Sequence, residues 1–439
     1  MNLINGNIKT IFKKYLIAAF GSAMITSIYS IVDVAMVGQY QGPNGTAALA
    51  VVAPIWNILY SLGLLTGIGG SVLLSMNRSN TQDFKQGEQY FTLAFFTTVL
   101  FSLLAWILLL TFENPLLCFF GANSSLLVLA KRYMQAIRFV IPLFLFNQMF
   151  AAFLRNDNNP SLATFAVLAG GIFNVFGDYF FVFTCDFGIY GAGLATAIGS
   201  VITFIILLSH FKSEKNTLHF VKIENMFLKL KKMLATGFST FFIDVAMGIL
   251  TILFNRQIMK YLGSDALAIY GPIIQVSTFV QCCAYSVGQA SQPIISSNYG
   301  AKKGERIQEV LRYALYAAAF FALFWTGLSM ICPNLYIYIF MVPTSKILQI
   351  APSIIRTYAL SFILLPVNIF STYYFQAILK AKVAFLISVA RGFLLSGCLI
   401  LTLPVFFNAN CLWLVMPITE LVVACFAFIE IKKSVHSFK

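Results

Sequence analysis

The chain has 439 residues, of which 59% are hydrophobic and only 10% are charged, whereas a soluble domain carries about 25% charged residues. This composition excludes a soluble globular protein and indicates a polytopic membrane protein. The net charge of +14 does not indicate nucleic-acid binding, because the lysines and arginines fall in short segments between apolar stretches rather than in one basic patch.

Twelve apolar stretches are each long enough to cross about 30 Å of hydrocarbon as a helix. They cover residues 14–38, 47–76, 89–112, 131–154, 161–183, 190–210, 234–259, 267–297, 311–333, 352–379, 383–404 and 409–431. Two of them, 47–76 and 267–297, are overlong and contain Pro and Gly, so we expect them to tilt or bend. The sequence therefore predicts an all-α polytopic membrane protein with twelve transmembrane helices.

The distribution of basic residues predicts the orientation of these spans. With the N-terminus inside, 21 of the 29 lysines and arginines lie in inside segments, 4 lie in outside segments and 4 lie within spans. Inside loops of membrane proteins carry an excess of lysine and arginine. We therefore expect a multi-pass protein of the cell membrane with both termini in the cytoplasm.

The longest inside segment, residues 211–233, carries six lysines and joins the sixth span to the seventh. It predicts a six-helix bundle at 1–210, a cytoplasmic linker at 211–233 and a second six-helix bundle at 234–439. The halves share a pattern, because Ala-Leu-Ala and Pro-Ile recur in residues 48–55 and 266–273. Six spans bring both halves into the membrane from the same side, so the repeat is parallel. Such repeats are typical of alternating-access transporters, with the substrate path between the halves.

Asp33 lies in the first span with apolar residues on both sides. An acid inside hydrocarbon costs about 2.5–3.5 kcal/mol on insertion scales, so we expect it to bind a cation, carry a proton or pair with a base. Counted from the outer face, Asp178, Asn174 and Thr196 fall at a similar depth in the fifth and sixth spans. These four side chains offer hard oxygen ligands suited to a sodium ion, and two neighbouring carboxylates can instead share a proton. The alternative is that they only tie helices together.

Other polar residues within spans have weaker assignments. Arg391 and Glu420 lie at comparable depth in the last two spans, and we expect a structural ion pair. Asp244, in the seventh span, is expected either to contact ion or substrate or to pair with Arg356.

Four amides are candidates for lining the substrate path. They are Asn147, Gln148, Gln275 and Gln281. Each can equally form an interhelical hydrogen bond. The 45 phenylalanines and 13 methionines mostly face lipid or fill helix packing, and a minority lining a path would suit flat or cationic amphiphiles.

Short motifs spread over nearly the whole chain are similar to those of one family. They are residues 29–33, 37–38, 48–55, 153–157, 159–160, 292–295, 298–302 and 374–377, with Asn174, Asp178, Arg391, Trp413 and Pro417. On these motifs the chain resembles the multidrug and toxic compound extrusion (MATE) family, in the subgroup whose ion site lies in the N-terminal bundle. The resemblance implies two helical bundles that export amphipathic or cationic organic compounds against inward flow of sodium ions or protons.

The chain departs from the family's pattern in two places. Ala18 replaces a proline that many members of this subgroup carry about fifteen residues before the acid of the first span, although Gly21 can still soften that helix. Asn158 stands where a glycine is usual. Another subgroup places acidic ion-binding residues in the C-terminal bundle, and Asp244 can be read as a remnant of that arrangement.

The sequence gives less support to other functions. The runner-up is a flippase for lipid-linked precursors from the same superfamily, whose members often carry a strongly basic cavity. A membrane enzyme is disfavoured, because the three histidines lie outside the spans and the eight cysteines form no metal-ligand spacing. There is no filter-like repeat for a channel and no phosphate-binding loop for nucleotide. We expect no cofactor beyond the coupling ion, a small-molecule substrate and the lipid bilayer as partners, and a monomer.

Overall fold

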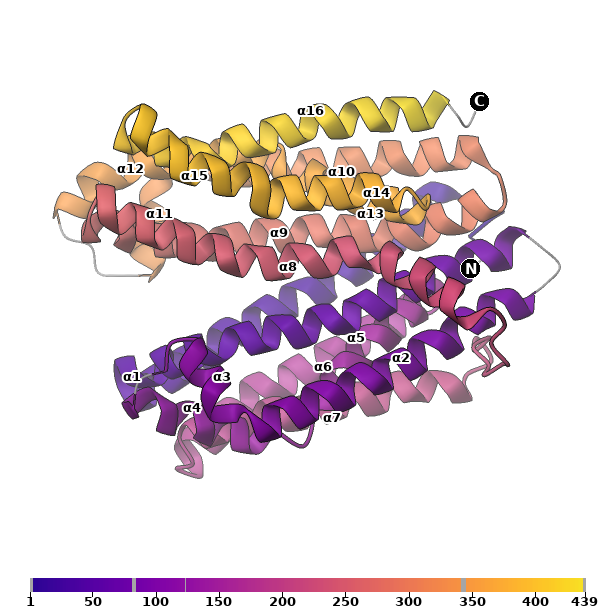
Figure 1. Cartoon of the computed structure of the whole chain (residues 1–439), viewed down its shortest axis with the longest axis horizontal. Helices are drawn as coiled ribbons and strands as arrows, with labels where there is room; N and C mark the ends of the chain where they lie inside the picture. Colours follow the sequence, from indigo (N-terminus) through magenta and orange to yellow (C-terminus); the bar gives the residue numbers. More distant parts are fainter. Residues whose placement is uncertain (1–2, 81–83, 123, 341–344, 437–439) are drawn as a thin grey trace. The chain divides into compact units, whose positions relative to one another are not determined.

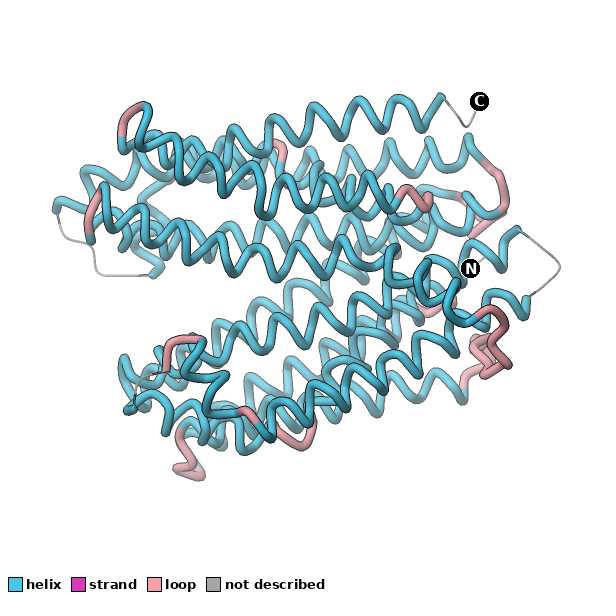
Figure 2. The backbone as a smooth tube through the Cα atoms, viewed as in Figure 1, coloured by secondary structure: helices cyan, strands magenta, loops and turns pink. Residues whose placement is uncertain are grey.

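The structure is a computed structural model that describes residues 3–80, 84–122, 124–340 and 345–436, and nearly all of this chain is helical (Figure 2). The helices of the first half are α1 (Ile8–Asn80), α2 (Phe84–Thr111), α3 (Glu113–Phe119), α4 (Ser124–Ile137), α5 (Ile141–Asn156), α6 (Pro160–Tyr179), η1 (Phe180–Thr184), α7 (Ile189–Leu208) and η2 (Ser209–Lys212). Those of the second half are α8 (Met226–Tyr261), α9 (Ser264–Gly300), α10 (Gly304–Ile331), α11 (Pro333–Phe340), α12 (Ser345–Ala359), η3 (Leu360–Ile363), α13 (Leu365–Ala377), α14 (Ala381–Val389), η4 (Ala390–Leu394), α15 (Leu395–Phe406), η5 (Ala409–Leu414) and α16 (Val415–His436).

Within the described residues, eleven helices are long and apolar enough to cross a membrane, and the bent pair α4–α5 makes a twelfth span. The prediction of an all-α polytopic membrane protein is confirmed, and each predicted stretch coincides with one of these spans. The stretch predicted as one helix over 131–154 is bent by 60° between Ile137 and Ile141. Pro142 stands in the first turn of α5, where its missing N–H costs nothing, and it prevents α4 from running straight on.

The first two spans join without a loop. The predicted connection 39–46 is helical except at Gly42, whose φ of 65° and ψ of −156° break α1 into two arms. Only glycine adopts this backbone conformation readily, because it has no Cβ to clash with the neighbouring carbonyl. One residue therefore ends one span and begins the next.

The chain folds into two compact units (Figure 1). The first comprises Met1–Asn5 and Ile17–Phe241, and the second comprises Gly6–Leu16 and Phe242–Lys439. The chain thus passes from one unit to the other within α8, whereas the sequence predicts a division at the loop 211–233. The first turns of α1 belong to the second unit, where Arg306 Nη2 donates to Gly6 O at 2.7 Å. The division predicted from the sequence, and the parallel repeat, stay predictions.

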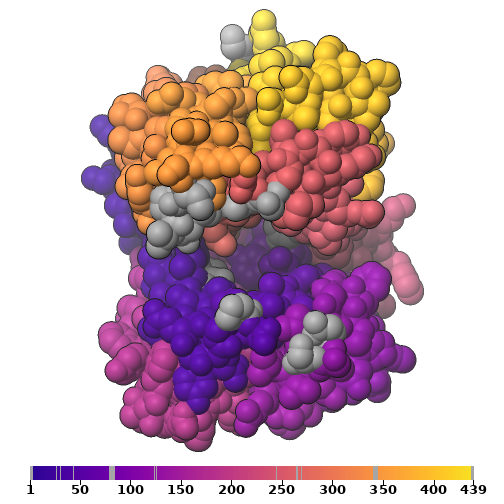
Figure 3. Space-filling view, turned by 90° about the vertical axis from the view of Figure 1, so that its left-hand side faces the viewer, coloured from indigo at the N-terminus to yellow at the C-terminus, as the bar shows by residue number. Residues whose placement is uncertain are grey.

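Each unit is a bundle of packed helices, and Figure 3 shows one face of the molecule in space-filling form. In the first unit, α5 packs against α2, α6 and α7. In the second, α13 is buried along its whole length and packs against α9, α10, α14 and α16. The polar side chains described below lie between these packed helices.

The loop between α7 and α8 is held on the first unit by the buried carboxylate of Asp157. It accepts hydrogen bonds from Arg78 Nη1 at 2.8 Å, His210 Nε2 at 2.7 Å and the Thr217 backbone N–H at 3.0 Å. The fully buried His210 also faces Asn159 through its other ring nitrogen, at 3.1 Å. Burial raises the pKa of Asp157, but the hydrogen bonds from His210 and Thr217 and the charge of Arg78 outweigh it and hold the pKa below its ordinary value.

The neighbouring Asn158 explains one departure from the family's pattern. Its φ is 59°, in the left-handed region. Glycine reaches this region at no steric cost, and asparagine tolerates it better than most residues. The backbone turn that a glycine usually makes is therefore kept.

Candidate functional site

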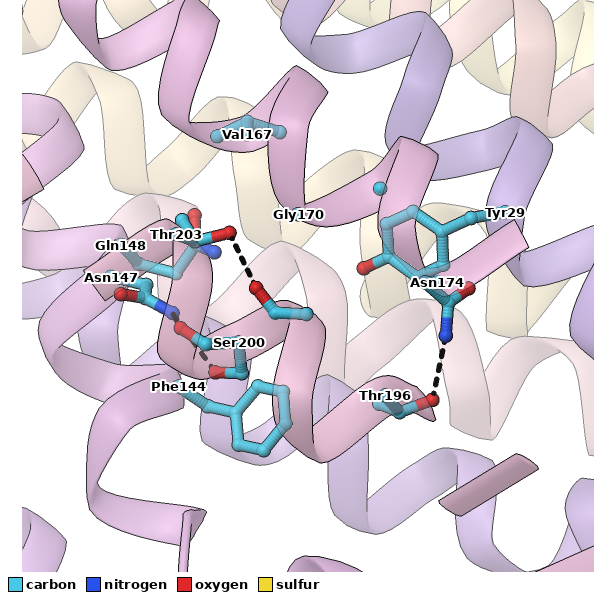
Figure 4. Close-up of a pocket in the computed structure, with 12 residues that line it drawn as sticks. Tyr29, Phe144, Asn147, Gln148, Val167, Gly170, Asn174, Thr196, Ser200 and Thr203 are labelled. Carbon is cyan, nitrogen blue, oxygen red and sulfur yellow. Dashed lines mark hydrogen bonds between the residues drawn. The ribbon is translucent and has the colours of Figure 1, made fainter. Parts of the chain in front are cut away.

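A polar cluster lies inside the first unit, at the level where α1, α4, α6 and α7 meet. It contains all four residues predicted as a coupling site. Asn174 Nδ2 on α6 donates to Thr196 Oγ1 on α7 at 3.1 Å (Figure 4). Asp178, one turn further along α6, lies within electrostatic range of Asp33 on α1. We call these four residues together with Tyr133 the outer cluster.

Tyr133 joins the parts of the outer cluster. Its hydroxyl donates to Asp33 Oδ2 at 3.1 Å and also interacts with Thr196. The residue comes from α4, the first half of the bent span, and is buried. The bend between α4 and α5 therefore helps to position a partner of Asp33.

The local sequence explains how α6 and α7 come close enough for the contact between Asn174 and Thr196. A Cβ on Gly170 would lie 2.6 Å from the carbonyl oxygen of Gly199, so the two backbones meet at a pair of glycines. Two residues after Asp178, at Phe180, α6 widens into the π-helical turn η1. Such turns interrupt the regular hydrogen bonds of a helix and often occur at functional sites.

The outer cluster has more acceptors than donors. Asp178 is fully buried, while Asp33 and Asn174 are 9% and 3% exposed. Within the described part of the chain, Asp33 Oδ1, Asn174 Oδ1 and both carboxylate oxygens of Asp178 have no hydrogen-bond donor. Buried acceptors without a donor are costly, and a charged carboxylate is the costliest of them. This arrangement fits a bound cation or a proton held between the acids.

The type of oxygen narrows the choice of ion. Carboxylate, amide and hydroxyl oxygens suit hard cations, whereas zinc and other transition metals favour imidazole and thiolate. Among the residues described, no three His, Cys, Asp or Glu side chains gather as they would around such a metal. The outer cluster is thus suited to a sodium ion, which Asp33, Asn174, Asp178 and Thr196 would hold, or to a proton.

A cavity of about 240 Å³ opens beside the outer cluster, within the first unit. Asp33, Tyr133 and Thr196 of the outer cluster are among the residues that line it. The remaining lining residues are Tyr29, Ala53, Trp56, Asn57, Tyr60, Phe144 and Gln148. Trp56 and Phe144 meet edge to face, with ring centroids 4.3 Å apart. The cavity therefore presents one carboxylate within a wall of which half the residues are aromatic.

A smaller pocket of about 70 Å³ shares Tyr29, Asn174 and Thr196 with this region (Figure 4). Asn147 and Gln148 both line it, and Gln148 lines the larger cavity as well. Asn147 is buried and donates Nδ2 to the backbone oxygen and the hydroxyl of Ser200, at 3.1 and 3.0 Å. Asn147 thus makes an interhelical contact, and Gln148 is placed to contact a small molecule.

The remaining path candidates belong to the second unit. Gln275 is exposed, and Gln281 donates to Ser277 on its own helix α9 at 3.4 Å. The side chain of Asp244 lies outside the described residues. Their part in a substrate path stays a prediction.

Arg391 and Glu420 form a separate buried pair in the second unit. Arg391 Nε lies 2.6 Å from Glu420 Oε1, and both side chains are fully buried. Asn368 Nδ2 donates to Glu420 Oε2 at 2.6 Å and to the Glu420 backbone oxygen at 2.8 Å. The two Nη atoms of Arg391 have no hydrogen-bond partner among the described residues. This geometry is what the predicted structural ion pair requires, and its role stays a prediction.

The sequence reasoning missed Tyr133 and the aromatic wall of the cavity. Tyr133 carries a usable signal, because it is a hydroxyl near the outer end of a predicted span, at a depth similar to that of Asp33. Trp56 and Tyr60 carry none, because aromatic residues at helical spacing also face lipid. Only packing decides which of them line a cavity.

A family model described as MatE matches residues 18–180 and 240–399 of the chain. Among curated proteins, the chain is 21% identical over 401 residues to the "Multidrug export protein MepA" of Staphylococcus aureus, covering 89% of this chain and 84% of that protein. It is 22% identical over 317 residues to the "Probable multidrug resistance protein YoeA" of Bacillus subtilis, covering 69% of this chain and 67% of that one.

The fold is also similar to solved structures. One is described as the outward-facing conformation of a multidrug resistance MATE family transporter. It superposes with a TM-score of 0.91 over 99% of this chain and 98% of the other, at 18% sequence identity. At this identity the likeness establishes the fold.

Proposed function

The chain belongs to the MatE family of membrane transporters, and on this basis we propose that it is a secondary-active exporter of amphipathic or cationic organic compounds, driven by inward flow of sodium ions or protons. Both termini are placed in the cytoplasm in this proposal, and the protein works as a monomer. It is a transporter and not an enzyme.

One observation carries the coupling part of the proposal, namely the unpaired oxygens of the outer cluster. Asp33 and Asp178 are two carboxylates inside one bundle, and no lysine, arginine or histidine is among their hydrogen-bond partners in the described residues. The negative charge of these two carboxylates must be balanced by a bound ion, and in an exporter this ion must be able to enter and leave the bundle. A sodium ion, or a proton shared between the two acids, meets this requirement and leaves the bundle folded in either state.

The cavity supports the substrate part of the proposal. Its wall of Tyr29, Trp56, Tyr60 and Phe144 offers flat faces for stacking and for cation–π contact. Asp33 belongs both to this wall and to the outer cluster. An organic cation in the cavity and the coupling ion therefore compete for one carboxylate, which gives the linkage that exchange requires.

The test is efflux of ethidium, a flat aromatic cation, from proteoliposomes carrying a sodium gradient, a proton gradient, both or neither. We expect Asp33→Asn and Asp178→Asn to abolish gradient-driven efflux at matched expression, because a neutral amide can neither balance the charge of a bound sodium ion nor exchange a proton. Thr196→Ala should weaken efflux less, because a hydroxyl contributes one neutral ligand. The gradient that drives efflux identifies the coupling ion.

Asp244→Asn is the control from the other unit and should leave coupling nearly unchanged. Binding of ethidium to the purified protein separates the two parts of the proposal. Asp178→Asn, which lies outside the cavity wall, should keep ethidium binding, and Trp56→Ala should weaken it. If Asp33→Asn retains gradient-driven efflux while Asp244→Asn loses it, the coupling site is in the second unit and the assignment is wrong.

A further inference from the structure

The start of α8 exposes three consecutive apolar side chains. Met226, Phe227 and Leu228 are 47%, 81% and 69% exposed. We call them the apolar trio. A contiguous exposed apolar run is unfavourable in water and usually marks an interaction surface. The trio lies at the end of a spanning helix, so the surface that it can meet includes the bilayer.

Three basic side chains follow the apolar trio. Lys229, Lys231 and Lys232 follow it directly in α8, and we call these three the α8 lysines. Lys231 stands one turn after Phe227, and Lys232 one turn after Leu228, so each apolar side chain shares its helix face with a lysine. Glu224 is the nearest acid, and three lysines leave the segment basic.

The packing of the preceding loop places this segment at the membrane boundary. Phe220 contacts Phe95 and Phe96 of α2, with ring centroids 5.0 and 6.5 Å apart. Phe96 is 58% exposed on an apolar spanning helix, so Phe220 lies against a lipid-facing surface. Lys229 Nζ and the Glu224 N–H both donate to Gln89, in the first turns of the same helix.

The length of α8 also bears on where the apolar trio lies relative to the bilayer. Its 36 residues extend about 54 Å at about 1.5 Å per residue. Hydrocarbon about 30 Å thick takes up only part of this length, so the helix projects beyond it by several turns. The apolar trio occupies the first turn of α8, at one end of this length, and therefore lies away from the hydrocarbon centre.

We propose that the apolar trio and the α8 lysines form a binding site for anionic phospholipid. The trio enters the boundary between headgroups and acyl chains. Lys231 and Lys232, which are exposed, have stems long enough to reach the headgroups and pair with the phosphates, while Lys229, bound to Gln89, adds its positive charge nearby. The charge of the segment favours an anionic phospholipid. The lysines match its negatively charged headgroup, and the apolar trio matches its acyl chains. Zwitterionic lipid would match only the apolar part.

The test measures contact of residue 227 with lipid. Phe227→Trp is reconstituted into bilayers containing either brominated phosphatidylglycerol or brominated phosphatidylcholine at equal mole fraction, and tryptophan quenching is compared. The signal is taken as the difference from the parent protein, which has four tryptophans. We expect stronger quenching by the brominated phosphatidylglycerol, corresponding to a relative affinity of roughly fivefold for one lysine's attraction. High salt should reduce this ratio.

Two matched variants complete the experiment. Replacing the three α8 lysines by glutamine should bring the ratio to about one, while replacing Lys9, Lys13 and Lys14 by glutamine removes the same charge elsewhere and should leave it unchanged. Phe96→Trp reports contact with the acyl chains and should be quenched by both lipids. Equal quenching of Phe227→Trp by both lipids would overturn the proposal. Quenching only by aqueous acrylamide, or protection from every quencher because another protein surface covers the segment, would overturn it as well.

Discussion

Removing either partner of the buried pair Arg391–Glu420 is expected to destabilise the second unit strongly. Glu420→Gln leaves the Arg391 guanidinium without its counter-charge, and Arg391→Met leaves the Glu420 carboxylate with only the amide of Asn368 as a side-chain partner. Neither site is reached by solvent, because both side chains are fully buried. Water therefore cannot replace the lost partner.

The magnitude follows from this burial. Breaking a buried ion pair by removing one partner costs about 3–5 kcal/mol, because an uncompensated charge remains in a region of low dielectric constant. For a domain of the size of the second unit, about 1 kcal/mol corresponds to a shift of about 2–4 °C in the midpoint of unfolding. Each single variant should therefore unfold on the order of 6–20 °C below the parent. The double variant should lose less than the sum of the two, because it leaves no unpaired charge.

The measurement is thermal unfolding of the purified protein in detergent, for the parent, both single variants and the double. Lys433 and Glu430 provide a matched control: their N–O distance is also 2.6 Å, but Lys433 is 65% exposed. An exposed pair contributes about 0–1 kcal/mol, so Glu430→Gln should move the midpoint by a few degrees at most. Additive losses for Arg391→Met and Glu420→Gln, or a loss for Glu430→Gln as large as theirs, would refute the reasoning from burial.

Three further outcomes are expected from other parts of the chain. The pKa of Asp157 is lowered in the folded protein. The ionised Asp157 carboxylate therefore contributes its full share of stability above the unfolded pKa of about 3.9, and this share is lost as the pH falls below that value. Thermal melts between pH 6 and pH 3 should show this loss of stability in the parent protein and not in Asp157→Asn. In a protein whose native cysteines are replaced, a membrane-impermeant thiol reagent applied to intact cells should label Lys346→Cys and not Lys222→Cys, because the basic residues place these positions on opposite sides of the membrane; labelling of Lys222→Cys from outside would reverse the orientation. A Cβ on Gly237 would lie 2.1 Å from the Leu65 carbonyl oxygen, so Gly237→Ala should cost about 1–3 kcal/mol in the same melts, whereas Gly248→Ala on the same helix has no atom within 4 Å and should be nearly neutral.

The sequence by itself determined the membrane class, the number of spans and the family. These follow from local quantities: the length of each apolar stretch is set by the thickness of hydrocarbon, and one acid such as Asp33 is conspicuous because burying it is costly. Counting residues from the outer face also brought Asp33, Asn174, Asp178 and Thr196 to one level. Depth along a helix can be read from the sequence, because every residue adds the same rise.

Only the tertiary structure decided which side chains of different helices contact each other at that depth. The rotation of each helix about its axis, and the choice of neighbour, depend on packing between segments far apart in the chain. Tyr133 was therefore found beside Asp33 only after folding, and the unpaired oxygens of Asp178 became visible only once every neighbour was placed. For the same reason His210, which the sequence predicts to lie outside the spans, is fully buried in η2 against Asp157, because its burial is set by the helices that pack around it.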